Sequence, residues 1–220
     1  MGVMKNSIIL TKENKENQII EVTAYHLQDL KVVVKFPELR KLVLIGGQVL
    51  DFQELKCCPK LYELDLQLTE VDNFSTLQEI KSVEYLNIAG NYQELMETVQ
   101  NMSQLKHLAL KHCYNLDLLG LRKLTRLTSF SIDDTGEDLG ILEVVSMPRL
   151  GRLKVFIPRE YEQWHLDCFL YSLRLNLPKL EWLELVISAQ EFHPKTLHDL
   201  KLKHLSVTSK PFYLCEEKED

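Results

Sequence analysis

The chain has 220 residues, of which 45% are hydrophobic and 26% are charged, and its formal net charge is −6 at pH 7. This composition is ordinary for a globular protein, and the chain is long enough to bury a continuous core. The negative charge would repel a phosphate backbone, so it disfavours nucleic acid as a partner.

The cysteines do not suggest a disulfide framework. There are five, irregularly spaced, and Cys57 and Cys58 are adjacent. This usage favours a reducing compartment. The apolar run at residues 7–10 is too short for a signal-peptide core or a membrane span. We therefore predict a cytoplasmic or nuclear protein with no membrane partner.

In chain order, residues 1–16 are predicted as an N-terminal cap or flexible segment, with a capping strand at residues 7–11. Residues 17–210 then repeat one phrase that has apolar residues at its first, fourth and sixth places, as in Leu105, Leu108 and Leu110. The phrase begins at Asn17, Leu39, Leu61, Val83, Leu105, Leu127, Leu150, Leu180 and Leu202. The first six starts are evenly spaced, and the last two have the same spacing again. Such regularity indicates about nine structural repeats.

Within each phrase, inward apolar residues alternate with outward residues at a period of two, which predicts a short strand with one buried face. The returns between strands carry their own apolar positions, namely Phe52, Leu55, Phe74, Leu77, Met96, Val99, Leu118 and Leu121. A further apolar place before the next strand is filled by Phe36, Cys58, Ile80, Met102, Leu124 and Met147. One coil cannot bury its apolar edge alone, so the coils must stack and share a core.

The longest unit lies between Leu150 and Leu180, and its residues 159–175 show helical spacing. We predict an α-helix on the convex side that ends before Pro178. Its expected apolar stripe is Leu166, Phe169, Leu170 and Leu173. Residues 211–220 are predicted as C-terminal cap residues and an acidic tail.

The phrase resembles the leucine-rich repeat, L-x-x-L-x-L-x-x-N/C-x-L, over roughly residues 17 to 208. The resemblance implies an α/β solenoid with a curved parallel sheet on the concave side. Irregular or short helical returns and one longer helix would form the convex side. The family's ninth place holds Asn or Cys, which bonds backbone groups where the strand ends. Here this place reads Gly47, Thr69, Asn91, Cys113, Thr135, Pro158 and Ser188, so we expect a weaker polar ladder.

Family members usually bind partners through the alternate residues on the concave face. In this chain Phe156 and Trp182 accompany Arg152, Lys154 and Glu184 on that face. Aromatic residues beside arginine are typical of interface hot spots, so this cluster is the main predicted partner-binding site. The alternative is that the longer neighbouring unit covers these side chains and packs them.

Tyr85, His107 and Lys111 lie on the same predicted face and extend the binding surface. The same face also carries acidic residues, which favour a solvated surface. They are Glu63, Asp65 and Asp133.

Metal and catalytic sites are not indicated. His165 and Cys168 are close on the predicted helix, and His107, His112 and Cys113 are close in sequence, but neither group has the paired motif of a zinc site. The sequence contains no G-x-S-x-G motif, P-loop or G-x-G-x-x-G motif. We predict no enzyme activity, no cofactor, no metal and no small-molecule substrate.

The predicted function is a non-catalytic scaffold that binds a protein partner of unknown identity on its concave face. Residues 57–66 and 177–185 also resemble repeats of F-box/leucine-rich repeat proteins. That resemblance implies an alternative role as the substrate-recognition part of a ubiquitin ligase receptor. The segment 1–16 before the first repeat is too short for an F-box, so this alternative requires a truncated or adaptor-less form. A regulatory subunit of an intracellular complex is a further alternative, since such proteins have a similar repeat period.

The register predicts that Leu108→Asp unfolds the protein. The substitution removes about 1.5 to 3 kcal/mol of apolar burial and places a carboxylate in the core. Thermal denaturation followed by circular dichroism would measure this loss. A melting temperature near that of the wild type would show that the register is wrong.

Overall fold

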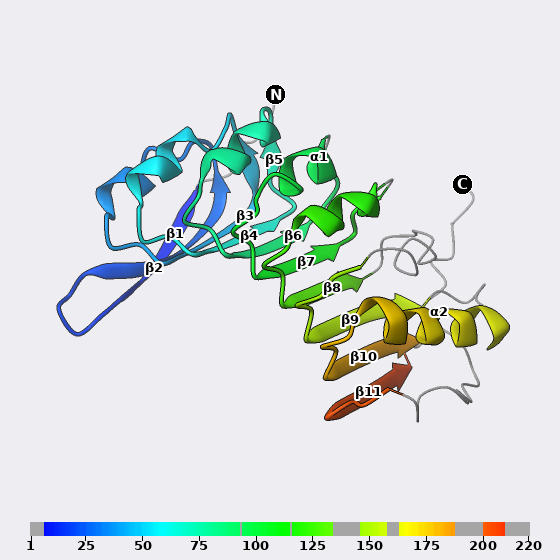
Figure 1. Ribbon diagram of the computed structural model, residues 1–220. Helices are drawn as coiled ribbons and strands as arrows, with labels where there is room; N and C mark the ends of the chain where they lie inside the picture. Colours follow the sequence, from blue (N-terminus) through cyan, green and yellow to red (C-terminus); the bar gives the residue numbers. More distant parts are fainter. Residues whose placement is uncertain are drawn as a thin grey trace.

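The computed structural model describes residues 7–92, 94–114, 116–133, 146–157, 163–187 and 200–209. The strands form one sheet in the order β1-β2-β3-β4-β6-β7-β8-β9-β10-β11, and β5 pairs with β3 outside this path (Figure 1). The strands are β1 (Ile8–Glu13), β2 (Ile19–Leu27), β3 (Lys41–Val49), β4 (Glu63–Gln67), β5 (Glu70–Val71), β6 (Tyr85–Ala89), β7 (His107–Lys111), β8 (Ser129–Asp133), β9 (Arg152–Ile157), β10 (Trp182–Ile187) and β11 (His204–Ser209). The returns contain 3-10 helices η1 (Val33–Lys35), η2 (Gln53–Cys57), η3 (Phe74–Glu79) and η4 (Leu118–Lys123), and α-helices α1 (Leu95–Val99) and α2 (Gln163–Asn176).

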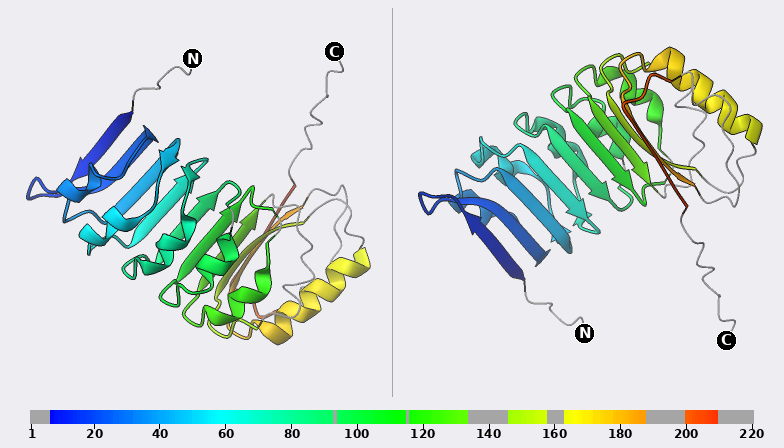
Figure 2. Two further views of the ribbon diagram at one scale, coloured as in Figure 1. Left: turned by 90° about the horizontal axis from the view of Figure 1, so that it is seen from above. Right: turned by 90° about the horizontal axis from the view of Figure 1, so that it is seen from below.

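The sheet and the returns form two layers. From above, the helical returns lie in front of the sheet, and from below the strands lie in front (Figure 2). From β2 to β11 the neighbouring strands of the main path are parallel, because each return carries the chain back before the next strand begins. The predicted α/β class is therefore confirmed. We call the face of the sheet that the returns do not cover the open face.

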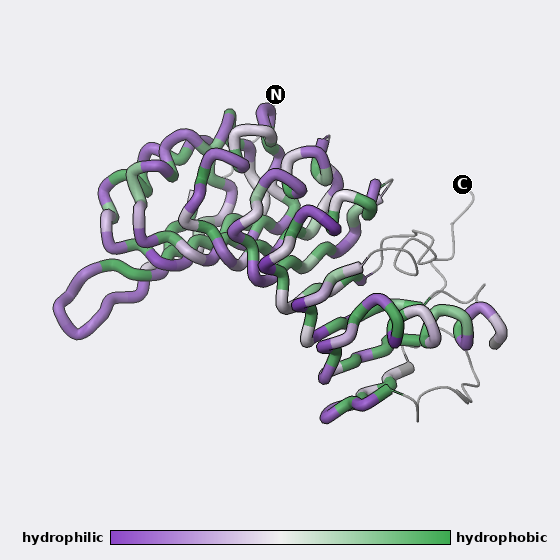
Figure 3. The backbone as a smooth tube through the Cα atoms, viewed as in Figure 1, coloured by the Kyte–Doolittle hydropathy of each residue, from purple (hydrophilic) through white to green (hydrophobic). Residues whose placement is uncertain are grey.

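An antiparallel hairpin closes the N-terminal edge of the sheet. β1 pairs with β2, and Lys12 forms an ion pair with Glu21 at 2.7 Å across the two strands. In the turn, the Asn14 side chain accepts hydrogen bonds from the backbone N–H groups of Glu16 and Gln18. This turn is coloured hydrophilic in Figure 3. Residues 8–11 of the predicted capping strand, which was 7–11, thus lie within β1.

Strand pairing agrees with the predicted register from the second repeat onward. Lys41 pairs with Glu63, and Glu63 pairs with Tyr85, each one repeat further along the chain. The longer intervals also agree, because Arg152 pairs with Ser129 on one side and with Trp182 on the other. The irregular spacing at the C-terminal end is therefore absorbed by the returns and leaves the pairing of the strands unchanged.

The predicted register of the first repeat is wrong by two places. Glu21 pairs with Lys41, whereas the repeat alignment predicted Ile19 opposite Lys41. The core residues of β2 are consequently Val22 and Ala24, and Ile20 is half-buried. Side chains on a strand alternate with a period of two, so a shift by two places leaves the inward face unchanged. The apolar pattern alone could not reveal the shift.

One continuous core fills the space between the sheet and the returns. The predicted inward strand residues from Leu42 to Leu185 are all buried, as are the eight return positions from Phe52 to Leu121. The departures lie near the ends of the array. Leu205 and Val207 are 41% and 42% exposed because β11 is the last strand of the sheet, and Phe36 near the first coils is half-buried.

The predicted helix of the long unit is α2, which ends at Asn176, shortly before Pro178. Its inward stripe of Leu166, Phe169, Leu170 and Leu173 is buried, as the spacing predicted. The helix lies on the side of the returns, in front of β9 and β10 (Figure 1).

A partial polar ladder joins successive coils where the strands end. The Cys113 thiol donates a hydrogen bond to the carbonyl of Gly90 at 3.0 Å, and the Thr69 hydroxyl donates to the carbonyl of Gly46 at 3.3 Å. Burial raises the pKa of the Cys113 thiol to about 11, which keeps it protonated as a donor near neutral pH. The Asn91 side chain accepts from the next coil's backbone. The ladder positions Thr135, Pro158 and Ser188 lie outside the described residues.

Gly47 departs from the ladder pattern for a steric reason. Its φ is +85°, and a Cβ atom there would lie 2.4 Å from the Leu27 carbonyl oxygen and 2.6 Å from the Leu27 nitrogen. A side chain would therefore clash with the backbone of the preceding coil, and only glycine fits.

We expect Gly47→Ala to destabilise the protein by at least about 2 kcal/mol, because it combines an unfavourable φ with a backbone clash. Gly151→Ala is the matched control, since a Cβ there would have its nearest neighbour at an ordinary 3.7 Å. Urea denaturation of both variants would measure the difference. Equal stabilities would contradict the close approach of the two coils.

Candidate partner-binding surface

A row of side chains crosses the open face at the start of successive strands. Parallel strands in register hold equivalent residues about 4.8 Å apart, so neighbouring side chains in the row touch. We call this the first row, and from β3 to β11 it consists of Lys41, Glu63, Tyr85, His107, Ser129, Arg152, Trp182 and His204.

The N-terminal part of the first row is held by polar and stacking contacts. Lys41 Nζ lies 2.5 Å from a Glu63 carboxylate oxygen. The rings of Tyr85 and His107 stack with centroids 5.9 Å apart, and His107 Nδ1 lies 3.0 Å from the Ser129 hydroxyl. Each contact joins neighbouring strands, so these side chains are ordered before any partner arrives.

The C-terminal part of the first row is a three-residue stack. The Arg152 guanidinium lies 5.0 Å from the centre of the Trp182 ring, within the range of a cation–π contact. The Trp182 ring in turn stacks on His204, with centroids 3.7 Å apart and an angle of 24°. Trp182 is still 38% exposed, and Tyr85 is 39% exposed. The row therefore presents aromatic surface to the solvent.

These two parts enclose a hollow of about 720 Å³ on the open face. First-row residues from Tyr85 to His204 line it, together with residues that directly precede the strands. The lining residues are Tyr85, His107, Thr128, Ser129, Gly151, Arg152, Glu181, Trp182, Lys203 and His204. We call this space the first-row hollow.

The hollow brings together four of the eight residues that the sequence predicted for partner binding: Tyr85, His107, Arg152 and Trp182. Lys154 and Glu184 lie two residues further along their strands and form an ion pair at 2.8 Å. An exposed pair of this kind contributes about 0 to 1 kcal/mol to stability, so its value to a binding surface lies in its fixed geometry.

Phe156 and Lys111 lie apart from the hollow. Phe156 is half-buried on β9, opposite the buried Val186 of β10. Lys111 is exposed at the end of β7 and lines a second hollow of about 280 Å³ with Asp65 and Asn87. The structure therefore divides the predicted surface between the two ends of the strands.

Two of the predicted acidic residues, Glu63 and Asp65, are bonded to neighbouring side chains. Glu63 is paired with Lys41, and its hydrogen bond is the main cause of the raised Lys41 pKa. Burial raises the pKa of Asp65, against a hydrogen bond from Gln67 that lowers it. Their carboxylates are therefore partly buried and bonded, whereas a solvated face was predicted.

Six residues that line the hollow were not among the predicted binding residues. They are Thr128, Ser129, Gly151, Glu181, Lys203 and His204. Ser129 and His204 could have been chosen, because the repeat places them in the same column as Arg152 and Trp182. The other four directly precede strands, and no feature of the repeat phrase marks such positions as surface.

His107 lies at the centre of a hydrogen-bonded chain on the open face. Its Nε2 donates to the Asn87 side-chain oxygen at 3.1 Å, and its Nδ1 accepts from the Ser129 hydroxyl. Burial lowers the pKa of His107 below its usual 6.5, although the Glu63 carboxylate partly opposes this shift. The imidazole is therefore neutral near pH 7.

The Ser129–His107–Asn87 chain has the connectivity of a hydrolytic triad, but its surroundings do not support that chemistry. The lowered pKa makes His107 a weaker base, and the neutral Asn87 amide cannot stabilise an imidazolium as a carboxylate does. The backbone N–H groups of Ser129 and Gly151 donate to carbonyls of neighbouring strands. They therefore cannot form an oxyanion hole. The geometry suits an ordered polar surface better.

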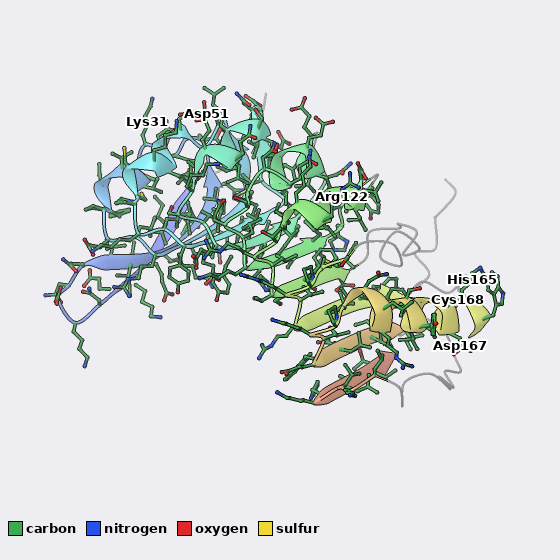
Figure 4. The ribbon with its side chains drawn as sticks, viewed as in Figure 1. Lys31, Asp51, Arg122, His165, Asp167 and Cys168 are labelled. Carbon is green, nitrogen blue, oxygen red and sulfur yellow. The ribbon has the colours of Figure 1, made fainter. Side chains whose placement is uncertain are left out.

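Among the described residues, no group of three or more His, Cys, Asp or Glu side chains could hold a metal ion. Figure 4 shows His165, Asp167 and Cys168 together in the first half of α2, on the return side, and none of the three lines the first-row hollow. Within the same described ranges, no helix is long and apolar enough to cross a membrane.

We expect His107 to titrate below pH 6.5 in a histidine-resolved NMR titration. Between its lowered folded pKa and the unfolded value, the unfolded chain binds more protons, so the folded state loses stability as the pH falls through this window. His107→Gln should make the free energy of unfolding less dependent on pH between about 7 and 5. A midpoint at or above 6.5 would contradict the burial of this imidazole.

No protein-family model and no curated protein sequence matches the chain. Among solved structures, it is similar to an internalin C2 from Listeria monocytogenes, with 20% identity over 86% of this chain and 81% of the other and a TM-score of 0.58. It is also similar to an internalin, InlF, from the same organism, with 18% identity over 88% and 71% of the two chains and a TM-score of 0.51. These neighbours are leucine-rich repeat proteins. Their likeness, with the evenly repeated strand register, shows that this chain has the leucine-rich repeat fold.

Proposed function

We propose that the protein is a non-catalytic scaffold whose open face binds a protein partner at the first-row hollow. The observation that carries this proposal is the exposed aromatic surface of Tyr85 and Trp182, held in place by stacking on His107, Arg152 and His204. Large aromatic residues and arginine dominate the binding energy of protein interfaces. Side chains that are already ordered also lose less entropy on binding.

The dimensions of the surface support a protein partner. The hollow extends from β6 to β11, which are six neighbouring strands, and five spacings of about 4.8 Å give roughly 24 Å. A stable interface buries about 800 Å² on each partner, so a folded partner would also cover Lys154 and Glu184 on β9 and β10. The ion pair there would form part of the polar rim.

The proposal includes the cytoplasm or nucleus as the site of action, which rests on the cysteine usage. Cys58 and Cys113 are free and buried, and burial raises the pKa of each thiol to about 11. Among the described residues, no contact favours the F-box receptor alternative, which therefore rests on the resemblance alone.

We expect Trp182→Ala to weaken the binding of a purified partner by about 2 kcal/mol or more, as the loss of a central aromatic residue does at other interfaces. Trp164→Ala is the matched control, because Trp164 is an exposed tryptophan on α2 and lies outside the hollow. The partner would come from affinity purification with the wild-type chain and mass spectrometry. Isothermal titration calorimetry would then compare both variants with the wild type.

Retained affinity in Trp182→Ala, with melting temperatures near the wild-type value, would reject the first-row hollow as the binding surface. Loss of affinity in Trp164→Ala alone would instead place the partner on the return side.

A further inference from the structure

We propose that the first-row hollow receives an acidic side chain, Asp or Glu, from within an extended segment of the partner, and that Arg152 binds its carboxylate. This inference rests on the proposed function and names the chemistry of the partner at the same site. It begins from a difference between the three cationic side chains on or beside the hollow.

Two of these cations already have acidic partners. Lys154 is paired with Glu184 at 2.8 Å, and Lys203 is paired with Glu181 at 2.8 Å. Arg152 differs, because no carboxylate of the described residues lies within ion-pair distance of its guanidinium. Its side-chain contact is the face of the Trp182 ring, at 5.0 Å. Within the described part of the chain, the positive charge of Arg152 is therefore held in place and not neutralised.

A guanidinium that stacks through its planar face keeps its N–H donors at its edge. Arginine has five such donors, and two of them can bind both oxygens of one carboxylate. The Arg152 side chain has no hydrogen bond to another described side chain, so these donors are available to a ligand. The contact with the Trp182 ring, which itself stacks on His204, restrains the Arg152 side chain and reduces the entropy lost when a carboxylate binds.

The other groups in the hollow do not compete for this charge. His107 is neutral near pH 7 because burial lowers its pKa. Glu181 lines the hollow, but its carboxylate is bound to Lys203. The hollow therefore carries about one net positive charge from Arg152 on a chain whose net charge is −6. This local reversal of sign favours an anionic ligand here over the rest of the surface.

A single cation favours a carboxylate over a phosphoryl group. A phosphorylated side chain carries about −1.5 to −2 charges at pH 7 and is usually bound by clusters of arginine. One unpaired Arg152 matches the single charge of Asp or Glu. The charges of Lys203 and Lys154 are already balanced by their glutamate partners.

The position of Arg152 favours an internal residue of the segment over a chain terminus. Arg152 lies on β9, the fourth of the six strands that the hollow crosses, with Tyr85 at one end and His204 at the other. A segment that follows the row for about 24 Å has roughly seven extended residues. Its central residue would lie near Arg152, and apolar or aromatic residues on both sides would contact Tyr85 and Trp182.

The test starts with a selection of random dodecamer peptides on the immobilised wild-type protein. Selected peptides are synthesised with their acidic residue and with the corresponding amide. Binding is followed by the fluorescence of Trp182 in a Trp164→Phe background, since the chain has two tryptophans. Each peptide is measured against the parent, Arg152→Gln and the matched control Arg122→Gln. Arg122 lies on the return side, away from the open face (Figure 4).

We expect the selected peptides to share an internal Asp or Glu with apolar neighbours. Replacing that residue by its amide should weaken binding by about 10-fold or more, as the loss of a charge-assisted hydrogen bond does. Arg152→Gln should weaken the acidic peptide to the same degree and leave the amide peptide unchanged. Arg122→Gln should bind both peptides like the parent protein.

Two results would overturn the inference while the proposed function stands. One is a set of peptides that lose affinity in Trp182→Ala, measured by calorimetry, yet carry no acidic residue. The other is tighter binding when phosphoserine replaces the acidic residue, which would assign the hollow to a phosphorylated segment. Peptides that bind Trp182→Ala as well as the wild type would count against the proposed function itself.

Discussion

The in-register pairing of parallel strands is the constraint on which the rest of this structure depends. Each coil buries its inward residues only by stacking on its neighbours, and the pairing keeps Leu108 beside Leu86 and Phe130. The same pairing aligns the outward residues. The core and the rows of the open face are therefore two sides of one register, and a slip of one strand against its neighbour would disturb both.

The register also explains why side-chain contacts between neighbouring strands line up in one continuous row. Tyr85 stacks on His107, and Trp182 stacks on His204, because each pair occupies equivalent places on neighbouring strands. The long interval between β9 and β10 changes nothing on this face, since its extra residues form α2 on the return side. The returns vary in length while the rows stay aligned.

Three lysines of the described residues differ from Arg152 in their contacts. Lys41, Lys154 and Lys203 are each paired with a glutamate on the open face or at its edge. Arg152 lies over the Trp182 ring and forms no ion pair with another described residue. Exposed ion pairs contribute little to stability, so this arrangement mainly sets the charge pattern of the open face.

The sequence by itself determined the repeat, the inward residues and α2, because burial imposes a period of two on strands and a helical stripe on α2. It could not determine the register of β2, since a shift by two places preserves the apolar face. It also pointed to Arg152 and Trp182 as interface residues. Only the tertiary structure decided that Lys154 is paired with Glu184 while Arg152 lies over Trp182. Those outcomes depend on distances between neighbouring strands, which no pattern along one strand records.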